Sequence, residues 1–207
     1  MKWNDHIERV RAKVGRLVGV LGRASQVLGG QLTHMLYNSL VLPHLQYCLT
    51  VWGDLEEGRN QTLGESLLKY QKRLVGMIAE QRGRYHADPL FAKYSILKVQ
   101  DLYRQQLRIL GWQFYNGLLP ASQTAIFNKT SDVHSYSTRS AEKGIYFSSK
   151  DHRSIGYRVP KEWESIVKGT KEARSLNSFK RLSKDEFIKS YGLFNCSVGN
   201  CFVCVGS

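Results

Sequence analysis

The clearest helix in the sequence is Leu63-Gly64-Glu65-Ser66-Leu67-Leu68-Lys69-Tyr70-Gln71-Lys72-Arg73-Leu74-Val75-Gly76-Met77-Ile78. Its apolar side chains recur at three- and four-residue spacing, as expected when one face of a helix is buried. This apolar stripe consists of Leu63, Leu67, Tyr70, Leu74 and Ile78. Three basic residues, Lys69, Lys72 and Arg73, lie outside it. The pattern predicts an amphipathic helix with a buried face and a basic, exposed face.

The N-terminal residues show the same period. The expected apolar face consists of Ile7, Val10, Val14, Leu17 and Leu21, while Arg9, Arg16 and Arg23 recur every seven residues on another face. This basic ridge is either a solvated face or a phosphate contact. Glycines 29 and 30 predict a break, followed by a second helix over residues 31–42 that ends before Pro43.

Further helices are expected downstream. Asp88 as N-cap and Pro89 at the first helical position predict the start of a short helix. A longer helix over residues 102–114 is expected to end at Asn116-Gly117. Apolar spacing over residues 175–191 predicts a final amphipathic helix built on Leu176, Phe179, Leu182 and Phe187.

Helical periodicity fades between residues 128 and 161. Residues 144–148 and 154–159 are typical of short strands or extended loops, with residues 150–153 as the turn of a small hairpin. The expected fold class is therefore mainly α, with a helical bundle, a small β-hairpin or extended segment near residues 144–159, and a C-terminal helix. We expect three regions: a helical domain over 1–128, a basic extended segment plus the C-terminal helix over 129–191, and a disordered cysteine-containing tail over 192–207.

Composition indicates a basic globular protein. Hydrophobic residues make up 42% of the 207 residues, which favours a buried core, and 30 Lys and Arg against 17 Asp and Glu leave a net charge of +13. The basic excess increases after residue 60, which favours anionic partners. The sequence shows neither a secretory signal nor an apolar run of about 18 residues, so we expect a soluble intracellular protein, cytoplasmic or nuclear.

Basic residues on expected exposed faces are the candidates for contacts with nucleic-acid phosphates. They are Arg9, Arg16, Lys69, Lys72, Arg73, Arg139, Lys143, Lys150, Arg153 and Arg158. The aromatic residues Trp112, Phe114, Tyr115 and Phe127 lie close in sequence to Arg104 and Arg108. They either form a core or stack on the bases of a single strand.

The three C-terminal cysteines are weak candidates for a metal site. Cys196, Cys201 and Cys204 have a spacing that supplies three thiolate ligands to zinc, but no histidine follows His152 to complete the set. Reduced thiols in a tail are the alternative. The six histidines show no metal-binding or hydrolytic spacing, and no glycine-rich phosphate loop connects a strand to a helix. We therefore expect no catalytic residue and no cofactor.

A series of short segments spans nearly the whole chain in a fixed order. The segments are Lys2 to Ile7, Leu36 to Tyr47, Val51-Trp52-Gly53, Tyr70-Gln71-Lys72-Arg73, Asp88 to Phe91, Gly117 to Pro120, His134 to Arg139 and Ser178-Phe179-Lys180. Their order and spacing resemble the thumb and post-thumb region of non-LTR (LINE-type) retrotransposon reverse transcriptases. That family binds two metal ions through an aspartate pair in its palm, whereas none of the seven aspartates here adjoins another. The resemblance therefore implies a region of an RNA-directed DNA polymerase without its catalytic centre.

The function implied by this resemblance is accessory. Such a chain is expected to bind RNA or an RNA/DNA hybrid through phosphates, holding template and primer for a reverse transcriptase core if a longer product exists. Met1 stands directly before the first segment, which indicates either a fragment of a longer protein or a truncated reading frame. The alternatives are a protein-interaction module and a decayed transposon remnant with no activity of its own.

Overall fold

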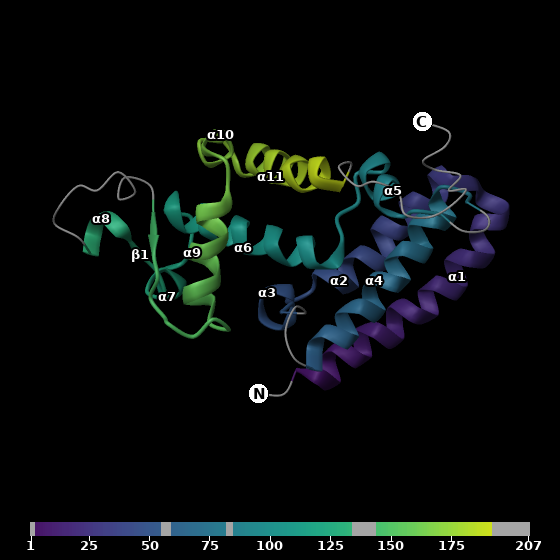
Figure 1. Cartoon of the computed structure of the whole chain (residues 1–207), viewed down its shortest axis with the longest axis horizontal. Coiled ribbons are helices and arrows are strands. Elements are labelled where there is room, and N and C mark those ends of the chain that lie inside the picture. Colours follow the sequence, from purple (N-terminus) through teal and green to yellow (C-terminus); the bar gives the residue numbers. More distant parts are fainter. Residues whose placement is uncertain (1–2, 55–58, 82–84, 134–143, 192–207) are drawn as a thin grey trace. The chain divides into compact units, whose positions relative to one another are not determined.

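A computed structural model describes residues 3–54, 59–81, 85–133 and 144–191 of the chain (Figure 1). These residues are mainly helical and include one small two-stranded sheet, which confirms the predicted fold class. The chain divides into two compact units: unit 1 is formed by Met1–Tyr103 and Glu186–Ser207, and unit 2 by Arg104–Asp185. No helix in the described segments is long and apolar enough to cross a membrane.

Unit 1 is built on two long helices, α1 (Asn4–Leu36) and α4 (Arg59–Ile78), which lie side by side (Figure 1). Apolar side chains spaced three and four apart on each helix form the core between them. The buried residues are Ile7, Val10, Val14, Val18 and Leu21 of α1 and Leu67, Leu74, Val75 and Ile78 of α4. The apolar faces predicted for both helices are thus largely confirmed.

Shorter elements complete unit 1. After α1 come a π-helix, η1 (Tyr37–Val41), and the short helices α2 (Leu42–Gln46) and α3 (Leu49–Trp52). After α4 come α5 (Asp88–Lys93) and the first residues of α6 (Val99–Tyr115), and the last residues of α11 (Leu176–Tyr191) also belong to this unit.

The predicted break at residues 29–30 is present as a kink inside α1. Gly29 adopts φ 70° and ψ 172°, a conformation open to glycine but strained for other residues. A Cβ atom on Gly30 would lie 2.2 Å from the carbonyl oxygen of Ile78. The second glycine therefore permits close contact between the backbones of α1 and α4.

The prediction that a helix ends before Pro43 is wrong, because the chain stays helical through η1 into α2. Proline has no N–H and clashes with the carbonyl four residues earlier in a regular α-helix. Here the N–H of Leu42 donates to the carbonyl of Tyr37, five residues back, and the wider turn places Pro43 in the first turn of α2. A local π-turn thus accommodates a residue that usually ends a helix.

The predicted capping of α5 by Asp88 also differs from the structure. The helix begins at Asp88, its N-cap is Ala87, and no side chain caps it. The Asp88 carboxylate instead lies 3.0 Å from Nζ of Lys98 and 3.6 Å from Nε2 of His86. The carboxylate therefore links α5 to the start of α6.

Gln71 of α4 is buried in the core of unit 1, and its side-chain amide is hydrogen-bonded at both ends. Its Nε2 donates to the hydroxyl of Tyr37 at 2.9 Å and to the carbonyl of Leu97 at 3.1 Å, while its Oε1 accepts the N–H of Val99 at 2.7 Å. Burial raises the pKa of Tyr37 to about 12, and the bond to Gln71 opposes that shift. One amide therefore connects α4, η1 and the start of α6.

Unit 2 contains the rest of α6 and α11, the short helices α7 (Ala121–Thr124), α8 (Thr130–Val133) and α10 (Lys168–Lys171), and the longer α9 (Ile155–Ser165). Strands β1 (Asn128–Lys129) and β2 (Ile145–Tyr146) pair antiparallel. Gly117, at φ 69°, ends α6, and the N–H of Leu118 donates back to the carbonyl of Gln113 at 2.8 Å. The predicted C-terminal ends of α6 and α11 are confirmed to within one residue, whereas α6 begins three residues before the predicted start.

Aromatic stacking forms the core of unit 2. Trp112 stacks on Phe179 with ring centroids 5.6 Å apart, and Tyr115 stacks on Trp163 at 5.4 Å. Phe114 and Phe127 are buried beside one another, with centroids 5.3 Å apart. The explanation of Trp112, Phe114 and Phe127 as core residues is confirmed, so these rings are not available to stack on bases.

The prediction of a strand or extended loop over residues 154–159 is wrong, because these residues form the N-cap and first turns of α9. Ser154 caps the helix by accepting the N–H of Gly156 at 3.2 Å. Pro160 lies inside α9 and cannot donate to the carbonyl of Gly156, which instead accepts the N–H of Ser148 at 3.2 Å. Within the predicted hairpin only β2 is a strand, and it pairs with β1.

Candidate nucleic-acid interface

The predicted basic ridge of α1 is exposed. Arg9 and Arg16 point to solvent, as does Arg23, which continues the seven-residue spacing. These three arginines form no ion pair with any described residue, whereas the neighbouring Arg11 lies 3.9 Å from Glu8. The ridge therefore presents uncompensated positive charge.

The basic residues of α4 are exposed as well. Lys69, Lys72 and Arg73 lie outside the buried stripe, as predicted. The Tyr85 ring packs over Gly76, where a Cβ atom would come within 2.0 Å of the Tyr85 hydroxyl, and this hydroxyl donates to the carbonyl of Lys72 at 3.1 Å. Burial raises the pKa of Tyr85, and the Arg73 guanidinium opposes that shift.

The basic residues of α1 and α4 form two rows. The two helices meet through their apolar stripes, and the basic residues of each helix lie roughly half a turn of the helical wheel from its stripe. The row on α1 therefore faces away from α4, and the row on α4 faces away from α1. The row on α1 runs from Arg9 to Arg23, about four turns of helix, whereas the row on α4 covers little more than one turn. The α1 row therefore suits an extended polyanion better than a single small anion.

In unit 2, two of the three predicted phosphate-binding cations near residues 150–153 already contact other groups of the protein. Arg153 lies 3.5 Å from the Asp151 carboxylate, and Nε of Arg158 donates to the carbonyl of His152 at 2.7 Å. The N–H of Arg153 and its charge hold the pKa of Asp151 below its usual value. Of the three predicted cations here, Lys150 is exposed and forms no ion pair with a described residue.

Five further predicted positions lie outside the described residues. Arg139 and Lys143 fall within residues 134–143, and the candidate zinc ligands Cys196, Cys201 and Cys204 fall within residues 192–207. Within the described segments, no group of three or more His, Cys, Asp or Glu side chains gathers in a way that holds a metal ion.

Two arginines near the aromatic core of unit 2 have a structural role. The Glu162 carboxylate of α9 lies 2.8 Å from Nε of Arg104 and 3.4 Å from Nε of Arg108, both on α6. Arg108, with only 5% of its side chain exposed, also donates to the Ser165 hydroxyl at 3.1 Å. These contacts join α6 to α9 and leave a buried cation compensated by a carboxylate.

A basic group on α11 was missed in the analysis of the sequence. This group lies within residues 180–184, little more than one helical turn, on the side away from the buried Phe179 and Ser183. It consists of Lys180, Arg181 and Lys184. The Gln105 side chain holds this turn by donating to the carbonyl of Lys180 at 3.1 Å. Burial lowers the pKa of Lys184, and the neighbouring Asp185 carboxylate opposes that shift. The signal was present in the 3.6-residue period of the final helix.

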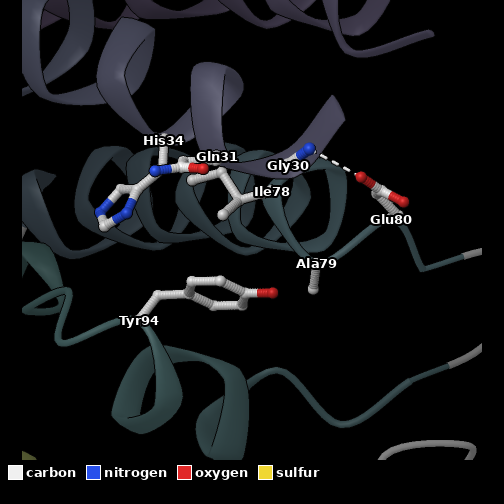
Figure 2. Close-up of a pocket in the computed structure, with 7 residues that line it drawn as sticks. All are labelled: Gly30, Gln31, His34, Ile78, Ala79, Glu80 and Tyr94. Carbon is white, nitrogen blue, oxygen red and sulfur yellow. Dashed lines mark hydrogen bonds between the residues drawn. The ribbon is translucent and has the colours of Figure 1, made fainter. Parts of the chain in front are cut away.

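A pocket of about 400 Å³ lies beside the kink of α1 (Figure 2). It is lined by Gly30, Gln31, His34, Ile78, Ala79, Glu80 and Tyr94. The His34 and Tyr94 rings meet edge to face with centroids 5.9 Å apart. The Glu80 carboxylate accepts the N–H of Gly30 at 2.6 Å (Figure 2), so its charge stabilises the start of the helical segment after the kink.

Comparison with known proteins assigns no family to this chain. The chain matches no family model, no curated protein and no solved structure. The candidate interface is therefore defined by its own geometry: a basic row on α1, another on α4 and a basic group on α11.

Proposed function

We propose that this chain binds the phosphate backbone of RNA or of an RNA/DNA hybrid, and that it does so as the thumb and post-thumb region of a LINE-type reverse transcriptase. In this role the chain binds template and primer for a polymerase core. It contributes binding and has no catalytic centre or cofactor of its own. The observation that carries the proposal is the set of exposed, uncompensated cations on α1 and α4.

The kind of contact follows from the residue types on these surfaces. Lys and Arg neutralise phosphates and release condensed counterions, which gives affinity without reading the base sequence. Trp112, Phe114 and Phe127, the aromatic residues that would stack on bases, are committed to the core of unit 2. Backbone binding with little sequence preference is therefore the expected mode.

The charge distribution supports the same proposal. Unit 2 carries fifteen Lys and Arg against seven Asp and Glu, and its Lys180, Arg181 and Lys184 project from one side of α11. Like charges this close on a helix repel one another, and a bound phosphate relieves that repulsion.

The test is a fluorescence-anisotropy titration of the purified chain against a labelled RNA/DNA hybrid and a labelled single strand, repeated over a range of salt concentrations. We expect the logarithm of the binding constant to fall with the logarithm of salt concentration with a slope of about −4 or steeper, which corresponds to four or more phosphate contacts. A folded sample with a flat slope, or with no binding at low salt, would contradict the proposal.

A variant locates the contact. Replacing Lys69, Lys72 and Arg73 together by glutamine removes three exposed cations from α4 without touching its buried stripe. The slope is expected to become shallower by about 0.9 for each lost contact. The matched control is Arg11→Gln, because Arg11 is already next to Glu8. An equal loss per charge removed in the variant and in the control would show that net charge alone, rather than this row, sets the affinity.

A further inference from the structure

The basic row of α1 contains a fourth cation, Lys13. It lies four residues after Arg9 and three before Arg16, so helical geometry places it on the face of α1 that these two arginines share. Its side chain is exposed and forms no ion pair with a described residue. From Arg9 to Arg23 the row extends over about 21 Å of helix, and it ends before the kink at Gly29.

An exposed aromatic ring lies at the N-terminal end of this row. Tyr47 directly follows α2 and is 67% exposed. Its ring lies against the ring of His6, with centroids 6.4 Å apart. His6 is on α1, three residues before Arg9 and seven before Lys13, between the buried stripe and the basic row. The Tyr47 ring therefore lies beside the first cations of the row.

The backbone of Tyr47 is held by hydrogen bonds on both sides. Its N–H donates to the carbonyl of Pro43 at 3.0 Å, and its carbonyl accepts Nε1–H of the buried Trp52 at 2.7 Å. The Trp52 ring in turn packs on His6, with centroids 5.6 Å apart. The Tyr47 hydroxyl forms no hydrogen bond with a described residue. The ring is thus anchored through its backbone, and its exposed side is open to a ligand.

A row of cations beside an exposed ring suits a single-stranded nucleic acid. Surfaces that bind single strands combine Lys and Arg along the phosphate backbone with aromatic rings on which bases stack. A duplex keeps its bases stacked inside, and its backbone turns by about 34° per nucleotide, so it curves away from a straight helix. A single strand can follow the helix and offer a base to the ring. At about 3.4 Å per nucleotide, a stacked strand along the row spans about six nucleotides.

We infer that the basic row of α1 and Tyr47 together bind single-stranded nucleic acid, with phosphates along the row and one base stacked on the Tyr47 ring. This inference rests on the proposed phosphate binding and adds the form of nucleic acid that unit 1 binds. Every base has a face that stacks on an aromatic ring, so the preference is for an unpaired strand and not for a base sequence.

The test compares anisotropy titrations of the full chain with a labelled single strand of about 12 nucleotides and with a blunt RNA/DNA hybrid of the same length. Tyr47→Ala should weaken binding of the single strand about fivefold or more, because one stacked base is lost. Its salt slope should not change, because no phosphate contact is lost, and its affinity for the hybrid should change less than about twofold. Tyr47→Phe keeps the ring and should bind the single strand like the wild type. Circular dichroism spectra confirm that both variants fold.

Substitutions in the row provide an independent measurement. Lys13→Gln should make the salt slope for the single strand shallower by about 0.7. Val20 lies on the same face between Arg16 and Arg23 and is 44% exposed, so Val20→Lys should make the slope steeper by about the same amount. The matched control is Val167→Lys, an exposed apolar position in unit 2, which adds the same charge outside the row and should leave the slope unchanged.

The outcomes separate this inference from the proposed function. If Tyr47→Ala weakens binding of the single strand and the hybrid equally, or weakens neither, the inference is overturned while phosphate binding by the chain still stands. An equal gain in slope from Val20→Lys and Val167→Lys also overturns it, because net charge alone would then set the affinity. A folded wild-type chain that binds neither nucleic acid at low salt overturns both the inference and the proposed function.

Discussion

Gln71 and Tyr37 are hydrogen-bonded inside the core of unit 1, with 2.9 Å between Nε2 of the amide and the hydroxyl oxygen, although they lie 34 residues apart in the chain. The same amide also pairs with the backbone groups of Leu97 and Val99. Both Nε2 and Oε1 of Gln71 therefore have hydrogen-bond partners, and a buried polar side chain is tolerated when its polar atoms are paired in this way.

Replacing Gln71 by leucine should therefore lower the free energy of unfolding by about 2–4 kcal/mol, because the Val99 N–H and the Leu97 carbonyl lose their partner in the core. Tyr37→Phe removes one hydrogen bond of the same group and should cost about 1 kcal/mol. Urea denaturation of the three proteins measures both values. Equal losses in the two variants would show that the backbone contacts of Gln71 contribute little.

Stability is expected to fall in alkaline solution because of two buried tyrosines. Burial raises the pKa of Tyr37 to about 12, and burial together with the Asp101 carboxylate raises the pKa of Tyr191. A tyrosine whose pKa is raised on folding stabilises the folded state fully below its unfolded pKa of about 10 and loses that contribution as pH rises towards the folded value.

Each of these tyrosines should therefore lower the free energy of unfolding by about 1.4 kcal/mol per pH unit above pH 10. Urea denaturation at pH 9, 10 and 11 measures the decline. Tyr37→Phe and Tyr191→Phe should each make it shallower, although both start from a lower stability at pH 9 because they lose hydrogen bonds to Gln71 and to Asp101, respectively. A decline as steep in both variants as in the wild type would assign it to other groups.

Glu80 tests the balance between backbone strain and a hydrogen bond. Glu80 lies two residues after the end of α4 and adopts φ 54°, in the left-handed region that favours glycine, and its carboxylate accepts the N–H of Gly30. Glu80→Ala loses the hydrogen bond and keeps the strain, so it should cost about 1 kcal/mol. Glu80→Gly loses the same bond but relieves the strain, so it should remain close to the wild type.

Thermal denaturation of the two Glu80 variants provides the measurement, with Gly30→Ala as a reference for steric damage at the same contact. That substitution places a Cβ atom against the Ile78 carbonyl and should be the most destabilising of the three. An alanine variant at position 80 that is as stable as the glycine variant would argue against strain at this residue.

The Glu162 carboxylate should be important for unit 2, because it compensates the buried guanidinium of Arg108. Glu162→Gln removes the negative charge beside this buried guanidinium and should lower the free energy of unfolding by about 3 kcal/mol. Arg104→Gln should cost less than about 1 kcal/mol, because 37% of the Arg104 side chain is exposed and solvent screens the pair. Guanidinium denaturation measures the free energy of unfolding of both variants. Similar losses would contradict the inference that the buried Arg108 pair contributes more than the exposed Arg104 pair.

The basic group of α11 should contribute to nucleic-acid binding. Replacing Lys180, Arg181 and Lys184 by glutamine should reduce the salt slope by up to about 2.7, and it should slightly stabilise the free protein by removing repulsion along the helix. Anisotropy titrations and thermal denaturation measure the two effects. A variant that binds like the wild type would confine the interface to unit 1.

Sequence periodicity was a good guide wherever a helix had one continuous buried face. The stripe over residues 63–78 and the glycines at 29 and 117 correctly indicated α4, the kink of α1 and the end of α6. It failed at Pro43 and Pro160, where proline ordinarily argues against a helix. In both places the chain remains helical, since a π-turn accommodates the first proline and the Ser148 N–H pairs with the carbonyl freed by the second.

The amino-acid sequence by itself determined which faces of α1 and α4 are buried and which carry exposed cations, because those properties depend on spacing within a single helix. Only the tertiary structure decided that Gln71 meets Tyr37, that Glu80 meets Gly30 and that Glu162 compensates Arg108. The partners in these pairs are between 34 and 54 residues apart, so their contacts arise from helix packing and leave no local pattern in the sequence.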